Sequence, residues 1–344
     1  MPTLLSQRLR NDEGLMNSAI LLVDVASASR DYWKTFLQTY HYDVFTAEDE
    51  QSALRECGEL RPDIVLLHDT LPDVDGFELC RRLKANPLNL QIPVVLIKPS
   101  SDAADLARAR KAGAAEFWGT STSLREALSR VESLLRLRGY IDEQARSVVL
   151  SLARSVEAKS PLTDGHSERI VKYAVQLGIC LDWPEESLQE LRIACLLHDI
   201  GKVSIPDEIL LKPGALNEKE TAVIRQHPVI GENICAPLKS LRRILPAIRH
   251  HHEHMDGSGY PDGLHGNEIP LMARILQIAD IYDALVTARP YRRALCSEDA
   301  LDTLHKEASQ GRLDASLVWK FERICREGEC VSVRGRSMLA SYYA

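Results

Sequence analysis

Several features that mark other classes of protein are missing from this sequence. Its 344 residues include no apolar run that approaches the roughly 18 residues of a membrane-spanning helix. The first residues lack the apolar core of a signal peptide, and the eight cysteines form no CxxC pair. A net charge of −7 argues against a nucleic-acid backbone as partner but leaves room for a small anionic ligand. We therefore expect a cytoplasmic protein with reduced thiols, bound neither to membrane nor to nucleic acid.

The length and the ordinary composition, 45% hydrophobic and 26% charged, allow two domains with a sizeable core each. The pattern along the chain predicts the following divisions: a leader at 1–16, an α/β domain at 17–137, a helical linker at 138–158, an all-α domain at 159–329 and a tail at 330–344.

Short apolar runs alternate with helical patterns in the first domain. The predicted strands lie at about 19–24, 42–47, 63–67, 92–97 and 116–118. Strands that are apolar throughout, separated by helices, predict a parallel sheet covered on both faces.

This region resembles a response-regulator receiver domain, which has a flavodoxin-like α/β fold. The resemblance is carried by Val23-Asp24, by LPDVDGFEL at 71–79 and by KAGA at 111–114. Receivers use an acidic pair to hold Mg²⁺, an Asp as phosphoacceptor, a Thr or Ser, and a Lys.

The receiver pocket is degenerate at most of these positions. Counting back from Pro72 and Gly76 places His68 at the phosphoacceptor position. Val25 replaces the second acid, Lys98 the Thr or Ser, and Thr120 the Lys, so that only Asp24 remains. A Mg²⁺ site needs more oxygen ligands than one carboxylate. We expect a pseudo-receiver without a phosphoacceptor, used for dimerisation or partner contact.

One alternative keeps phosphorylation, because Asp69 follows His68 directly and could replace the missing acid. Successive strand side chains point to opposite faces, which disfavours that substitution.

Apolar residues recur at helical spacing through the linker, from Leu124 to Val156. They predict one long helix, or two in series broken near Gly139. Two interpretations remain open: a coiled-coil connector that supports a homodimer, or a last receiver helix followed by the first helix of the next domain.

Strand patterns disappear after Ser160, and we expect five to seven helices there. Histidines and aspartates recur beside the apolar segments of this region. They are His166, His198, Asp199, His227, His251, His252 and Asp280. Burying so many polar groups without a shared metal would be costly. Imidazoles with a few carboxylates suit Fe, Mn, Ni, Co or Zn better than Mg or Ca.

The second domain resembles the HD-GYP domain, a branch of the HD superfamily that hydrolyses cyclic di-GMP. The matching strings are HDIGKVSIPDEILLKPG at 198–214, HHEHMDGSGYPDGL at 251–264, IPLMARILQIADIYDAL at 269–285 and RPY at 289–291.

The resemblance implies a binuclear metal centre, with Fe or Mn favoured and Ni, Co or Zn as alternatives. One ion would be held by His166, His198, Asp199 and Asp280, and the other by His227, His251 and His252, with Asp199 shared. A hydroxide between the ions would attack phosphorus. Lys202 would contact a phosphate oxygen, unless it is an ordinary surface lysine.

The resemblance also implies a set of substrate contacts. They are Lys202, Gly259, Tyr260, Pro261, Asp283, Arg289 and Arg292, although Arg292 could instead face solvent. The Gly-Tyr-Pro loop would also contact GGDEF-domain partners, or would simply be a turn that closes the histidine cluster. Many family members hold a third ion with a Glu four residues before the first His. Leu162 occupies that position, and Asp164 is close to it, so we expect two ions.

Together these patterns predict a phosphodiesterase that converts cyclic di-GMP to pGpG, GMP or both, regulated through a degenerate receiver. Two other functions remain open: a cyclic di-GMP-responsive interaction protein with little hydrolysis, and a metal phosphohydrolase of another cyclic nucleotide.

Overall fold

The computed structural model describes residues 18–98, 103–119, 122–159, 165–288 and 293–327. The chain divides into two compact units, Met1–Gln144 and Ala145–Ala344, each described here by itself. Among the described helices, none combines the length and the apolar character that crossing a bilayer requires.

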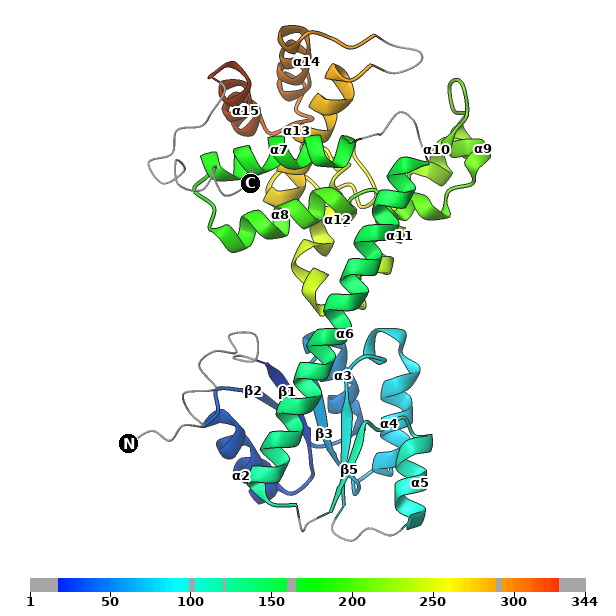
Figure 1. Ribbon diagram of the computed structural model, residues 1–344, viewed down its shortest axis with the longest axis vertical. Coiled ribbons are helices and arrows are strands. Elements are labelled where there is room, and N and C mark those ends of the chain that lie inside the picture. The colour runs from blue at the N-terminus through cyan, green and yellow to red at the C-terminus, as the bar shows by residue number, and fades with distance from the viewer. Residues whose placement is uncertain (1–17, 99–102, 120–121, 160–164, 289–292, 328–344) are drawn as a thin grey trace. The chain divides into compact units, whose positions relative to one another are not determined.

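The first unit is built on a five-stranded parallel sheet with strand order β2-β1-β3-β4-β5 (Figure 1). Its strands are β1 (Ala19–Val23), β2 (Asp43–Ala47), β3 (Ile64–His68), β4 (Val94–Lys98) and β5 (Glu116–Gly119). All five overlap the predicted strands. β1 and β3 are apolar runs buried on both faces along most of their length, whereas the edge strands β2 and β5 are buried only in part. The predicted α/β receiver fold is confirmed.

Helices cover both faces of this sheet, because alternate residues of each strand point to opposite sides. Ile20 and Leu22 pack on one face with α2 (Ser27–Gln38) and the start of α6 (Leu124–Ala158). Leu21 and Val23 pack on the other face with helices α3 (Glu50–Leu60), α4 (Gly76–Ala85) and α5 (Ala103–Lys111).

The predicted linker is one unbroken helix of 35 residues, α6, and no break occurs at Gly139. Within the first unit α6 is anchored by Arg138, whose guanidinium lies 3.1 Å from Asp63 and donates to the carbonyl of Pro62. Arg138 and Asp63 are both buried, and the Asp63 carboxylate also accepts the N–H of Ala19 at the start of β1. The last turns of α6 belong to the second unit.

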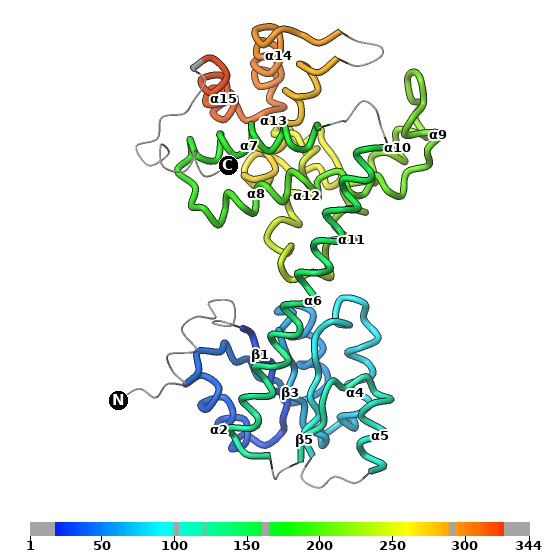
Figure 2. Tube along the Cα trace, viewed as in Figure 1, coloured from blue at the N-terminus to red at the C-terminus, as the bar shows by residue number. Residues whose placement is uncertain are grey.

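The second unit is helical, as predicted (Figures 1 and 2). Its α-helices are α7 (His166–Cys180), α8 (Glu185–Leu197), α9 (Asp207–Leu210), α10 (Glu218–Ile224), α11 (His227–Cys235), α12 (Leu245–His250), α13 (Leu271–Val286), α14 (Ser297–Ser309) and α15 (Ala315–Glu327). The described part therefore has more helices than the five to seven expected. α9, α10 and α12 have four, seven and six residues, too short to give a periodic pattern.

One apolar cluster joins α7, α8, α13, α14 and α15. It buries Leu191 of α8, Ile278 of α13 and Phe321 of α15 completely. Cys180, at the end of α7, is disulfide-bonded, contrary to the expectation that all thiols are reduced. The other described cysteines carry free thiols.

Candidate metal centre

The predicted metal ligands come together in the second unit, and most of them lie at or near a helix end. His166 begins α7, His198 follows α8 and His227 begins α11. His251 follows α12, and Asp280 lies within α13. Three groups have ligand atoms within 4.8 Å of one another: His227, His251 and His252; His166, His198 and Asp280; and His198, Asp199 and His251. Residues as far as 114 positions apart, His166 and Asp280, thus reach one place.

A close backbone approach brings two of these segments together. The 3-10 helix η3 (Ile200–Ser204), which follows Asp199, lies against α11. A Cβ atom on Gly201 would stand 1.9 Å from the carbonyl oxygen of His227, so only glycine fits at this position.

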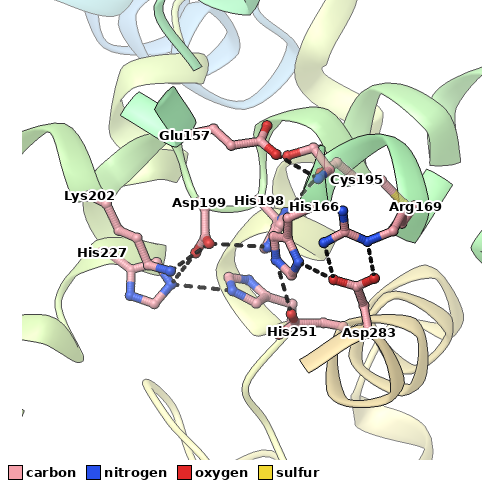
Figure 3. A network of polar contacts seen from close by, with 12 residues as sticks. Glu157, His166, Arg169, Cys195, His198, Asp199, Lys202, His227, His251 and Asp283 are labelled. Carbon is pink, nitrogen blue, oxygen red and sulfur yellow. Dashed lines mark hydrogen bonds and ion pairs between the residues drawn. The ribbon is translucent and has the colours of Figure 1, made fainter. Parts of the chain in front are cut away.

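Three histidines are oriented in the same way. The Nδ1 atoms of His198, His227 and His251 lie 2.7 to 2.8 Å from the backbone carbonyl three residues earlier. A carbonyl oxygen only accepts, so each Nδ1 must carry the hydrogen. In the neutral form of each ring, the Nε2 atom is then left with a lone pair that faces the shared centre (Figure 3).

The resulting contacts lack a proton donor, which is the observation that points to metal. Nε2 of His227 and Nε2 of His251 are 3.3 Å apart, and in their neutral forms these two rings have no hydrogen to place between them. Nε2 of His198 is buried, and its polar approach to a described residue is the 3.3 Å contact with Oδ2 of Asp199. Lone pairs of this kind are satisfied by a divalent cation, so the residues fit metal ions.

Asp199 stands between the two histidine groups. Its Oδ1 lies 3.2 Å from Nε2 of His227, and its Oδ2 lies 3.3 Å from Nε2 of His198. Lys202, one turn further along, donates to Oδ2 at 2.5 Å (Figure 3). The two oxygens of one carboxylate therefore face different groups.

His166 is held from behind by Asp283. The Asp283 carboxylate lies 2.7 Å from Nδ1 of His166 and accepts two hydrogen bonds from Arg169, at 2.6 and 3.0 Å. Nε2 of His166 then faces Oδ1 of Asp280 at 3.3 Å. Asp283 was predicted to contact substrate, and its position disagrees: it is 1% exposed, and both oxygens are occupied by Arg169 and His166. Its spacing of three from Asp280 would have indicated a supporting role.

The predicted ligands differ in the direction in which the site shifts their pKa values. Burial, reinforced by neighbouring histidines, holds the pKa of His251 well below its usual range and lowers that of His252 to about 3. Burial would also lower the pKa of His166, but adjacent carboxylates outweigh it and raise that pKa to about 9. Burial opposes ionisation of Asp199 and Asp280, yet a lysine and histidines lower the pKa of Asp199 far below normal and that of Asp280 to about 2. Both carboxylates are therefore charged at neutral pH.

A cavity of about 670 Å³ opens beside these groups. His166, Asp199, Lys202, His252 and Asp280 line one part of it. The remaining wall is mostly apolar and comes from α6, α8, α9, α10 and α13; it also contains Glu157 and Lys212, which sequence reasoning missed. The volume lies within the range of about 300–1,000 Å³ that is usual for small-molecule sites.

The Gly-Tyr-Pro loop, residues 259–261, is folded against His252. The ring of Tyr260 stacks on His252 with centroids 4.8 Å apart, and the guanidinium of Arg225 lies 5.1 Å from the centroid of Tyr260. A Cβ on Gly259 would stand 2.4 Å from Cα of Glu253. Only glycine therefore allows the loop to come this close to the backbone at Glu253. Gly259, Tyr260 and Pro261 are not among the described residues that line the cavity.

Glu253 anchors this loop and was not singled out from the sequence. Its side chain is completely buried, and its carboxylate accepts the N–H groups of Asp262, Gly263 and Leu264 at 2.7, 3.1 and 3.2 Å. Its carbonyl oxygen accepts from Gln277 at 2.6 Å. Glu253 thus fixes the loop that stacks on His252.

The receiver pocket can be followed at the carboxyl ends of the strands in the first unit. Asp24 follows β1 and is buried, and His68 ends β3 with Nδ1 3.3 Å from the carboxylate of Asp69. Lys98 ends β4 and forms an ion pair of 2.7 Å with Asp105 of α5.

Some predicted positions lie outside the described residues. They are Thr120, Leu162, Asp164, Arg289 and Arg292.

Comparison with known proteins matches each unit to a family. Residues 20–131 match the response regulator receiver domain, and residues 151–317 match the HD domain. The chain is 35% identical to "Cyclic di-GMP phosphodiesterase response regulator RpfG" of Xanthomonas campestris pv. campestris, over 92% of both chains. It is 31% identical to "Probable cyclic di-GMP phosphodiesterase" of Vibrio cholerae, over 84% of this chain and 74% of the relative.

A third relative matches the helical unit. "3'3'-cGAMP-specific phosphodiesterase 3" of Vibrio cholerae is 43% identical over 163 residues, which are 46% of this chain and 35% of the relative.

Proposed function

The chain belongs to the response regulators that join a receiver domain to an HD phosphodiesterase domain, and from that premise we propose that it is a metal-dependent cyclic di-GMP phosphodiesterase. The observation that carries the proposal is the set of buried histidine Nε2 atoms that converge on Asp199 and on one another. Water adds across a phosphodiester P–O bond, which breaks to leave a 5′-phosphate and a 3′-hydroxyl. One cut gives linear pGpG, and a second gives GMP.

The donor set supports two divalent cations, Fe or Mn in first place and Ni, Co or Zn as alternatives, because imidazole nitrogen predominates over oxygen. His166, His198, Asp199 and Asp280 would hold one ion, and His227, His251 and His252 the other. Ions bound there activate water as a nucleophile and stabilise charge on phosphate oxygens. Asp199 would be shared by both, since its two oxygens face different histidine groups.

The chain's own residues orient the substrate around that centre. Lys202 lies in the cavity wall with its ammonium against Asp199, where it can also donate to a non-bridging phosphate oxygen. Asp283 keeps Nδ1 of His166 protonated and so keeps Nε2 available as a ligand. The apolar wall suits the flat faces of guanine bases.

Further substrate contacts are proposed from the family resemblance. Gly259, Tyr260 and Pro261 would shape the entrance through the stack on His252, and Arg289 and Arg292 would contact phosphates or guanines through forked donors. The same loop would offer a surface to GGDEF-domain partners.

The receiver is proposed to be degenerate. An imidazole ends β3 where a receiver needs its phosphoacceptor carboxylate, and Lys98 pairs with Asp105 where a receiver needs a hydroxyl. Phosphorylation would then not be the input.

A homodimer in the cytoplasm is the proposed working state. α6 exposes a series of large apolar side chains that could pack against a second copy: Leu137, Tyr140, Ile141, Val148 and Leu152. Val148 and Tyr140 are 67% and 64% exposed.

The test is hydrolysis by the purified, metal-loaded full chain, followed by chromatography of cyclic di-GMP and, in parallel, 3'3'-cGAMP. We expect cyclic di-GMP to be consumed faster, and Lys202→Ala to slow turnover by about 100-fold. Lys306→Ala, on α14 away from the cavity, serves as the matched control. Faster consumption of 3'3'-cGAMP would change the substrate assignment. Metal-loaded protein that leaves both nucleotides intact would favour a binding protein instead.

A further inference from the structure

The last turns of α6 form part of the wall of the metal-site cavity. Ala153 and Val156 are buried there, and Glu157 lines the same cavity as His166 and Asp280. An acidic side chain in this wall repels a phosphate, so substrate binding does not account for it. The contacts of Glu157 indicate a different role.

The first turn of α7 needs hydrogen-bond acceptors from outside the helix. The first four N–H groups of any helix have no partner within it. The residue before α7 is Gly165, with φ of 67°, and it has no side chain with which to cap the helix. Instead, Oε1 of Glu157 accepts the N–H of Ser167 at 2.9 Å. Helix α7 is therefore capped from α6. A carboxylate at this end also complements the helix dipole.

This cap acts next to a predicted metal ligand. His166 is the first residue of α7, immediately before Ser167. Its ring is fixed by Asp283 on one side and faces Asp280 on the other. Its backbone is held by Glu157, because Glu157 accepts the N–H of the next residue, Ser167. The ring and the backbone of His166 are thus held by carboxylates from α13 and α6.

We propose that Glu157 is a positioning residue for His166, which makes the last turn of α6 a structural part of the metal centre. α6 contributes residues to both units of the chain. A change that displaces the last turn of α6 therefore reaches a metal ligand through one hydrogen bond. The inference rests on the metal binding proposed above.

The first measurement is hydrogen exchange at the Ser167 amide, resolved by mass spectrometry of the metal-free full chain. This amide has no acceptor inside α7, so its protection reports on Glu157. We expect Glu157→Ala to speed exchange about tenfold, the loss usual for a helix cap. Glu157→Gln retains an acceptor oxygen and should exchange like wild type. Glu126→Ala, an exposed acid near the start of the same helix, is the matched control.

The second measurement is the affinity for Mn²⁺, determined by competition with a chelator. Glu157→Ala should weaken the binding of one ion at least about tenfold, as loss of a supporting contact does, and Glu157→Gln should restore most of that affinity. Unchanged exchange in Glu157→Ala would overturn the inference, and so would faster exchange with unchanged affinity. Neither measurement involves hydrolysis. Failure of the proposed function would be seen separately, as metal-loaded wild type that leaves cyclic di-GMP intact.

Discussion

Replacing Glu253 with glutamine should loosen the Gly-Tyr-Pro loop and weaken the metal centre. The two side chains have nearly the same size and shape and differ mainly in charge. The buried carboxylate accepts three N–H groups from the loop. Hydrogen bonds to a charged group contribute about 1.5–3 kcal/mol each, against about 1 kcal/mol for neutral ones. Glutamine weakens each bond by about 1 kcal/mol and also turns an NH₂ group toward one of the three donors. The expected cost is about 3–5 kcal/mol of unfolding free energy.

Two assays follow this change. Scanning calorimetry should show a lower midpoint for Glu253→Gln, and limited chymotrypsin digestion should cut after Leu264, which the anchored loop protects. Metal content should fall as well, because Tyr260 no longer holds His252. Glu298→Gln, an exposed acid at the start of α14, should change stability by less than about 0.5 kcal/mol. A variant with wild-type stability, protease resistance and metal content would refute the anchoring role.

Three other predictions concern the metal ligands and the receiver. Asp283→Asn should weaken metal binding by about 10- to 100-fold in chelator competition; unaltered binding would contradict its role behind His166. In metal-free protein the folded pKa of His166 is raised to about 9 from 6.5. The protonated ring therefore adds about 3 kcal/mol of stability that is complete below pH 6.5 and is lost as pH rises through 9. The thermal midpoint should fall over that range, and His166→Gln should remove the slope. Incubation with a small phosphodonor should leave the receiver without an acyl phosphate; a stable acyl phosphate would show that Asp69 has replaced the acid missing at His68.

Much of the fold could be predicted because its signals are local. The central strands of the receiver unit are mostly apolar, and a strand buried on both faces leaves that pattern in sequence. The long helix α6 followed from its spacing, although only the structure shows that Gly139 does not interrupt it. The short helices α9, α10 and α12 lie below the length at which periodicity can be read.

Sequence reasoning named the residues that gather at the candidate site but not the groups that hold them in place. Motif resemblance identified the histidines and aspartates that the structure brings together. It could not show that histidine Nδ1 atoms bond to carbonyls three residues earlier, because that depends on how each helix ends. Glu157 and Glu253 were missed for a related reason. Their partners are backbone N–H groups, which leave no mark in the residue types nearby.

The most direct test counts metal ions and measures cyclic di-GMP turnover in the same samples of wild type and Asp199→Asn. The account predicts two ions per chain in the wild type. Asp199→Asn should lose metal and lower turnover by at least about 100-fold, more than loss of any single histidine, because its two oxygens serve both groups. Asp302→Asn, an exposed change on α14, should match the wild type. Wild-type metal content and turnover in Asp199→Asn would contradict the shared two-metal centre.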